Sequence, residues 1–194
     1  EMCIRDRVFY HIPVRAKEGH GVHLPALDTF LQQGLQIVLT CDTGIDASDA
    51  VEFARQRGVD FIITDHHSLP ETLPGACAVI NPQRLPEDHP ARTLSGVGVA
   101  WKLIAALTNE LGQLEISEQS LDLVALGLVA DISSLIGDAR YLVHLGLQHL
   151  RAHRRPGLPK MFALAEVNHS NLTEHPIGST TPPRLTVIRR LLPS

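Results

Sequence analysis

The fold is decided by the stretch Ile62-Ile63-Thr64-Asp65-His66-His67, in which an apolar run ends on an acid and two histidines. Residues Val59 to Thr64 have the apolar, β-type composition of a short buried strand. Asp65, His66 and His67 are therefore expected at the carboxyl end of that strand. In open α/β sheets this edge is where ligands bind.

A second apolar run, Gln36 to Cys41, also ends on an acid, Asp42. The helix-like segment Asp46 to Gly58 connects the two runs, which predicts a βαβ unit with parallel strands. Because parallel strands end at the same edge, we expect Asp42 to lie close to the group that begins at Asp65.

The remaining pattern predicts an α/β fold in which a parallel β-sheet is flanked by helices. A β-like run at Val8 to Val14 opens the domain, and we expect further sheet to precede it; Arg15 to His23 is expected to be a loop. A third strand is expected at Ala76 to Ile80. Helices are expected at Leu24–Gln33, Leu94–Leu111, Ser117–Ala130, Asp138–His153, Leu158–Val167 and Arg184–Leu192. We place one domain at residues 8–155 and a helical connection to a second domain at 156–194.

Composition limits the classes of function. The 194 residues include 44% hydrophobic, 20% charged and 4% aromatic residues, with a formal net charge of -4. This is the composition of a globular protein without a strongly basic surface or many aromatic platforms for bases. Three cysteines without Cys-x-x-Cys spacing indicate reduced thiols, and no stretch suits a membrane span or a signal peptide. The expected location is the cytoplasm.

Carboxylates and imidazoles at neighbouring strand ends are suitable ligands for a divalent cation. Asp131 adds to them, because it ends the apolar helical run that includes Val124 to Ala130, where the helix dipole disfavours an acid unless a cation compensates. Each feature also has a plainer interpretation. Asp42 and Asp131 could each begin a turn, and Asp65-His66-His67 could be a polar loop.

The segment Ser95-Gly96-Val97-Gly98 begins a predicted helix with residues that suit helix capping, and two interpretations of it stay open. Its backbone amides could bind a phosphate oxygen, because small residues allow close approach and the helix dipole favours anions. Alternatively, the glycines allow the helix to pack closely on the sheet.

Four segments resemble, in order, the motifs of the DHH phosphoesterases, and among these the RecJ exonucleases. They are Thr40–Gly44, Thr64–His67, Leu94–Lys102 and Val124–Asp131. The first motif of the family has no counterpart in Glu1 to Arg7. Because that motif supplies further metal-binding aspartates, we expect the chain by itself to be a poor catalyst.

The resemblance implies a role for each matching residue. Asp42 would be shared by two Mn²⁺ or Mg²⁺ ions, with His66 and Asp131 as further ligands. Asp65 would orient the site, and His67 would lie beside the scissile phosphate unless it is only structural. Substrate or phosphate binding is implied for Arg15, Ser95, Gly96, Gly98 and Arg184; the tail around Arg184 departs from the family pattern.

The function implied by the resemblance is metal-dependent hydrolysis of single-stranded DNA from the 5′ to the 3′ direction, in DNA repair and recombination. A single-strand-binding protein or a helicase would be its partner. Two alternatives stay open: another DHH enzyme that hydrolyses oligonucleotides, cyclic dinucleotides or pyrophosphate, or a non-catalytic scaffold of replication. The retained Asp42, His66 and Asp131 argue against the scaffold.

Overall fold

The predicted strands at Gln36–Cys41, Val59–Thr64 and Ala76–Ile80 form one parallel sheet, with the strand order β1-β2-β3. The computed structural model describes residues 8–152 and 155–164, and in it β1 is Ile37–Cys41, β2 is Asp60–Thr64 and β3 is Ala78–Ile80. The α/β fold class predicted from the sequence is confirmed. Helix α3, Ser48–Arg55, connects β1 to β2 as the βαβ pattern requires.

The register of the sheet aligns the last residues of all three strands. Cys41 pairs with Thr64, and Thr64 pairs with Ile80. The residues that follow the strands therefore start level with one another. Two backbone hydrogen bonds continue the pairing past the strand ends: Asp42 N donates to Thr64 O at 2.9 Å, and Asp65 N donates to Ile80 O at 3.1 Å. Both acids lie at the carboxyl edge, as the sequence predicted.

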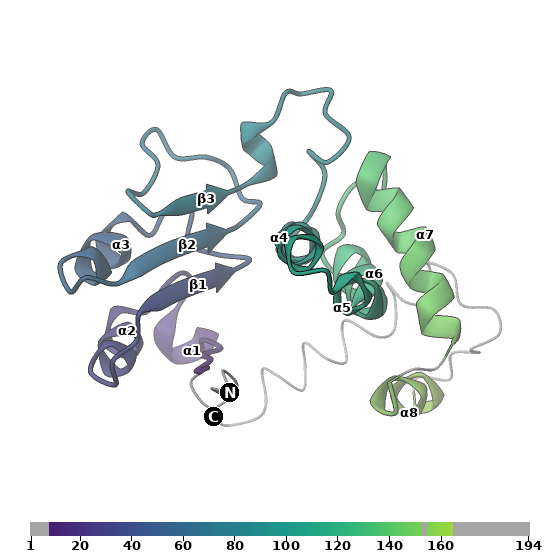
Figure 1. The fold of residues 1–194 in the computed structure, drawn as a ribbon, viewed down its shortest axis with the longest axis horizontal. Helices are drawn as coiled ribbons and strands as arrows, with labels where there is room; N and C mark the ends of the chain where they lie inside the picture. Colours follow the sequence, from purple (N-terminus) through teal and green to yellow (C-terminus); the bar gives the residue numbers. More distant parts are fainter. Residues whose placement is uncertain (1–7, 153–154, 165–194) are drawn as a thin grey trace.

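Helices surround this sheet in two groups. Figure 1 shows α2 and α3 beside the strands, whereas α4 lies beyond the arrowheads, with α5, α6, α7 and α8 farther from the sheet. The bounds are α1 Arg15–Glu18, α2 Leu24–Leu31, α4 Gly96–Glu110, α5 Leu114–Gln119, α6 Leu121–Ala130, α7 Gly137–Arg151 and α8 Gly157–Leu164, with a 3-10 turn η2 at Pro82–Arg84.

Two hydrophobic clusters stabilise these groups. One joins the sheet to α2 and α3, and its fully buried members include Ala54 and Ile63. The other lies among α4, α6 and α7, where Ala125, Leu128 and Ala139 are fully buried. Helix α6 is apolar around most of its surface and is enclosed by α4 and α7, as its sequence predicted. Helix α4 also contacts β1 and β2, so it connects the two clusters.

The predicted strand at Val8 to Val14 was wrong, because residues 8–14 form no regular structure. Most of its apolar side chains are exposed, including Val8, Tyr10 and Ile12. Only the rings of Phe9 and His11 lie near α2, at 5.7 and 6.3 Å from the ring of Phe30. The expected loop at Arg15 to His23 is also partly helical, since α1 occupies its first four residues. Its Glu18 accepts a hydrogen bond from Val14 N at 2.6 Å.

The helix expected from Ser117 to Ala130 is two helices. Helix α5 ends at Gln119 and α6 begins at Leu121, with Ser120 between them. Ser117 lies inside α5, and its carbonyl accepts hydrogen bonds from Trp101 Nε1 at 2.9 Å and Ser120 Oγ at 2.7 Å. A hydroxyl that bonds a carbonyl three residues earlier competes with the helical ladder, which explains the break.

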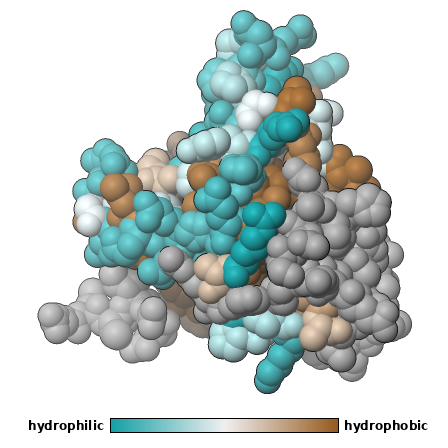
Figure 2. Space-filling view, turned by 90° about the vertical axis from the view of Figure 1, so that its right-hand side faces the viewer, coloured by the Kyte–Doolittle hydropathy of each residue, from teal (hydrophilic) through white to brown (hydrophobic). Residues whose placement is uncertain are grey.

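The face that lies on the right-hand side of Figure 1 presents many hydrophilic residues between smaller hydrophobic patches (Figure 2).

Some predictions fall outside the described residues. They are the helix expected at Arg184–Leu192, most of the connection at 156–194 and the end of the helix expected at Leu158–Val167. Among the described residues, no helix is both long enough and apolar enough to cross a membrane.

Candidate metal centre

The three predicted metal ligands come together. His66 Nε2 lies 3.1 Å from Asp42 Oδ1 and 3.7 Å from Asp131 Oδ2. Asp42 follows β1, His66 follows β2 by two positions, and Asp131 is the C-cap of α6. Side chains from three separate elements thus meet at the carboxyl edge of the sheet.

Asp42 reaches the centre through an unusual backbone conformation. Its φ of 65° lies in the left-handed region, which Asp adopts more easily than most residues with a side chain. Helix α4 begins directly against it: a Cβ atom added to Gly96 would lie 2.2 Å from Asp42 Oδ1. Gly96 is therefore required because its missing side chain leaves room for the carboxylate.

Asp65 does not face the solvent with Asp42, since its side chain is only 1% exposed. It accepts hydrogen bonds from Ile45 N at 2.9 Å, His66 N at 2.7 Å and His67 N at 3.2 Å. Its Oδ1 also lies 2.6 Å from His67 Nδ1. Burial raises the pKa of Asp65, but the hydrogen bonds from the His67 ring and from three backbone amides lower it more. The pKa of Asp65 is therefore below the usual range.

An ionised Asp65 fixes the tautomer of His67. A carboxylate can only accept, so Nδ1 of His67 carries the proton and donates it to Asp65. The side chain of His67 is 60% exposed, which leaves its Nε2 available to a bound molecule. This hydrogen bond is consistent with the orienting role that the family resemblance implies for Asp65.

His66 is surrounded by negative charge. Its hydrogen bond to Asp42 raises its pKa most, burial lowers it, and the charges of Asp131, Asp42 and Asp65 raise it further. The net pKa of His66 is above the usual range for histidine. The site therefore favours a positive charge at this position, and a metal ion would satisfy the same carboxylates.

The donors fit a divalent cation. Asp42, His66 and His67 each offer a ligand atom, and these atoms lie within 4.8 Å of one another. Asp131 adds a carboxylate oxygen near His66; the Ser133 hydroxyl donates to that oxygen at 3.0 Å. Carboxylate oxygen with imidazole nitrogen is a donor set that accepts Mn²⁺, and Mg²⁺ prefers the oxygens.

The residues predicted to contact the substrate or its phosphate are Ser95, Gly96 and Gly98 at the start of α4, and Arg15 and Arg184 elsewhere in the chain. A Cβ atom on Gly98 would lie 2.9 Å from Leu94 Cδ2, and Ser95 is buried without a side-chain cap bond to α4. Ser95 is the N-cap of α4, where the sequence suited helix capping, although its side chain makes no cap bond; the contacts of both glycines favour close packing of α4. Arg15 begins α1, while Arg184 lies outside the described residues. Phosphate binding by these residues stays a prediction.

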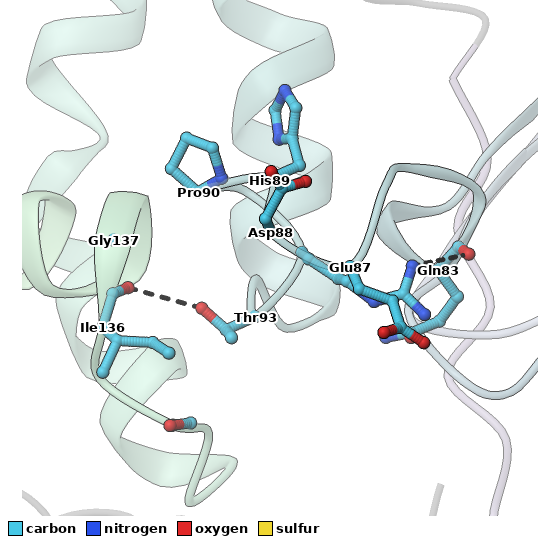
Figure 3. A pocket seen from close by; sticks show the side chains of 10 residues that line it. Gln83, Glu87, Asp88, His89, Pro90, Thr93, Ile136 and Gly137 are labelled. Atoms are coloured by element: carbon cyan, nitrogen blue, oxygen red, sulfur yellow. Dashed lines mark hydrogen bonds between the residues drawn. The ribbon is translucent and has the colours of Figure 1, made fainter.

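A cleft of about 660 Å³ lies beside the loop that follows β3, between residues 83–93 and 134–137. Figure 3 shows the Thr93 hydroxyl on one wall donating to the Ile136 carbonyl on the other, a bond of 3.3 Å. Asp42, His66 and Asp131 are not among its lining residues. The metal centre and this cleft are therefore separate features.

Sequence reasoning missed Asn81, which directly follows β3. The sequence indicated only that a strand ends there, although Asn81 is 5% exposed and its amide donates to the His67 carbonyl at 3.0 Å. The Ile45 amide that holds Asp65 was also missed. A polar residue directly after a third apolar run was the available signal for Asn81.

Comparison with known proteins finds relatives of this chain. The RecJ single-stranded-DNA-specific exonuclease of Haemophilus influenzae is 36% identical over 193 residues, which cover 95% of this chain and 34% of the relative. The protein of the same name from Bacillus subtilis is 36% identical over 185 residues, which cover 95% of this chain and 23% of the relative. The chain thus spans about a third or less of the length of these relatives.

Two solved structures share the fold. A crystal structure of exonuclease RecJ bound to manganese matches 93% of this chain and 45% of that one, with a TM-score of 0.82 and 31% identity. RecJ from Thermus thermophilus in complex with Mn²⁺ matches 87% of this chain and 25% of that one, with a TM-score of 0.76 and 28% identity. The model of the DHH family, N-terminal domain, matches residues 2–128, and the chain belongs to this family.

Proposed function

We propose that this chain is the metal-binding part of a phosphodiesterase that degrades single-stranded DNA from its 5′ end. The observation that carries the proposal is the convergence of Asp42, His66 and Asp131 on one point at the sheet edge. Mn²⁺ or Mg²⁺ would be held by these side chains. When bound, two such ions lower the pKa of a coordinated water and neutralise charge on the phosphoryl oxygens.

The protein's own groups would orient the substrate around that centre. Asp65 holds the ring of His67 through Nδ1, so a phosphate placed over the centre would meet the opposite nitrogen, Nε2. A protonated His67 would donate a hydrogen bond, or a proton, to a phosphate oxygen. The exposed carboxylate of Asp42 leaves the centre open to a chain of nucleotides rather than enclosed.

Support for the substrate class comes from the relatives named above, which are single-stranded-DNA-specific exonucleases. We extend that substrate, the 5′ to 3′ direction and a role in DNA repair and recombination to this chain as proposals. Contacts of Arg15, Ser95, Gly96, Gly98 and Arg184 with the DNA belong to the same proposal. We also propose a cytoplasmic location and a single-strand-binding protein or a helicase as partner, which co-purification would test.

The test combines metal binding with activity. Mn²⁺ titration of the purified chain, followed by electron paramagnetic resonance, should detect binding that Asp42→Asn abolishes. For activity, this chain should replace the matching segment of the Haemophilus influenzae relative. The hybrid should release nucleotides from the 5′ end of labelled single-stranded DNA only when Mn²⁺ is present, and Asp42→Asn should stop the release.

Asp28→Asn is the matched control, because Asp28 is a partly exposed acid on α2, outside the centre. It should leave Mn²⁺ binding and nucleotide release unchanged. Full activity of the Asp42→Asn hybrid, or equal Mn²⁺ binding by the wild-type chain and Asp42→Asn, would overturn the proposal.

A further inference from the structure

Asn81 occupies the third position in a row of polar residues along the carboxyl edge of the sheet. Cys41, Thr64 and Ile80 end the three strands in register, and the next residues are Asp42, Asp65 and Asn81. The two acids belong to the metal centre already described. Asn81 is neutral and buried, so it is placed to act on the centre from within the protein rather than as a ligand.

The side chain of Asn81 uses both ends of its amide. Its Nδ2 donates to the carbonyl oxygen of His67 at 3.0 Å, and its Oδ1 accepts from Gln83 N at 2.8 Å. The side chain of Gln83 in turn reaches the carbonyl oxygen of His66 at 3.5 Å. Two residues that follow β3 therefore contact the carbonyls of both histidines.

Asp65 holds the opposite side of the same backbone. Its Oδ1 accepts from the amide nitrogens of His66 and His67, at 2.7 and 3.2 Å. The amides are thus fixed by Asp65 and the carbonyls by Asn81 and Gln83. A backbone held on both sides sets the direction of the two imidazoles, because side-chain direction follows from φ, ψ and the rotamer.

We propose that Asn81 is a positioning residue of the metal centre: its amide N–H fixes the carbonyl of His67 and so keeps both imidazoles directed towards Asp42. This inference rests on the proposed function, since it assumes that Asp42 and His66 bind a cation. Groups that orient metal ligands from behind typically change metal affinity by about 10- to 100-fold when they are removed.

A purely structural role is the competing explanation, because Asn81 also caps the 3-10 turn η2 through Oδ1. The two roles use different atoms of the side chain, so they can be separated. Asn81→Ser keeps an oxygen that can cap η2 but removes the N–H that reaches His67, whereas Asn81→Ala removes both. Asn109→Ser, at an exposed position in the last turn of α4, is the matched control.

The experiment measures Mn²⁺ affinity by electron paramagnetic resonance and thermal unfolding by circular dichroism, on the purified chain. Asn81→Ser and Asn81→Ala should both weaken Mn²⁺ binding by about tenfold or more. Asn81→Ala should also unfold at a lower temperature than Asn81→Ser, because only it loses the cap. Asn109→Ser should match the wild type in both measurements.

A second readout needs no metal. In the metal-free protein, the backbone amide resonances of His67 and Ser68 should shift in Asn81→Ser, because the peptide between them loses the donor to its carbonyl. Wild-type Mn²⁺ affinity in a folded Asn81→Ser would overturn the inference. Failure of both Asn81 variants to fold would also overturn it, since Asn81 would then serve the fold rather than the centre.

Asp42→Asn separates this inference from the proposed function. If Asp42→Asn binds Mn²⁺ as well as the wild type, the proposed metal centre fails, and the role of Asn81 fails with it. If Asp42→Asn loses binding while Asn81→Ser keeps it, only the positioning role is wrong.

Discussion

Asp42 and Asp65 are the same residue type in the same register position, yet they have opposite environments. Each follows one of the paired residues Cys41 and Thr64 at the end of its strand. The carboxylate of Asp42 is 58% exposed, whereas that of Asp65 is 1% exposed and accepts hydrogen bonds from three amides and one imidazole. An exposed carboxylate can bind a ligand, whereas a buried carboxylate with all its hydrogen bonds made stabilises the fold and orients its neighbours.

The largest expected effect is on stability. Asp65→Ala should lower the free energy of unfolding by about 3 kcal/mol or more, because buried amide donors would lose their acceptor. Asp42→Asn should change it by less than about 0.5 kcal/mol, because the side chain is exposed and Asn tolerates the left-handed backbone. Urea denaturation followed by circular dichroism measures both. Equal destabilisation by the two variants would abolish the distinction between the acids.

Metal binding should separate the two acids in the other direction. Asp42→Asn should weaken Mn²⁺ binding by about a hundredfold or more, a larger loss than the 10- to 100-fold expected for groups behind the ligands. Isothermal titration with Mn²⁺ checks this, with Asp28→Asn as the control. Retained affinity in Asp42→Asn would show that its exposure has another cause.

A substitution at Gly96 should disturb Asp42 less than replacing Asp42 itself. In Gly96→Ala the added methyl group would collide with Asp42 Oδ1, at 2.2 Å, and should displace that carboxylate from His66. We expect about a tenfold loss of Mn²⁺ affinity, together with about 1–3 kcal/mol of destabilisation from overpacking.

Gly75→Ala is the matched control for Gly96→Ala. An added Cβ atom at Gly75 meets nothing within 4 Å, and its φ is outside the left-handed region. Unchanged Mn²⁺ binding in Gly96→Ala would mean that the start of α4 yields easily, and that its contact does not hold Asp42 in place.

The smallest effect concerns a third carboxylate, Glu18, which is held like Asp65 but lies outside the centre. The amide of Val14, followed by the nearby His11 and His23, keeps the pKa of Glu18 below its usual range despite some burial. A lowered pKa means that the ionised form stabilises the fold above the usual glutamate pKa. That contribution should be lost as pH falls through the lower, folded-state value.

Hydrogen exchange of the Val14 amide measures this local effect. After correction for the intrinsic pH dependence of exchange, its protection should fall as pH drops below the usual glutamate range, and Glu18→Gln should remove that dependence. Protection that stays constant across the same range would contradict a charged Glu18 at this contact.

The sequence determined the elements near the site well. Apolar runs that end on Asp42 and on Asp65-His66-His67 required strands, and the helical segment between them required a parallel pair. These signals are local in the chain, so they survive without knowledge of the fold. The run Val8 to Val14 failed for the same reason. Its apolar side chains fit a strand, but most of them stay exposed, and only the rings of Phe9 and His11 lie near Phe30 on α2.

The tertiary structure decided which of these acids is exposed and which is buried. The apolar runs that precede Asp42 and Asp65 do not tell the two acids apart. Long-range contacts separate them: α4 packs against Asp42 at Gly96, and the Ile45 amide reaches Asp65 from 20 positions earlier in the chain. The β2–β3 register brings Asn81 to the carbonyl of His67, a contact that the sequence did not indicate. The local sequence was enough to show that carboxylates and imidazoles are present at the strand ends. Which acid is open to a ligand and which is enclosed was decided by burial and by hydrogen bonds between distant segments. Burial and these hydrogen bonds depend on packing that only the folded chain creates.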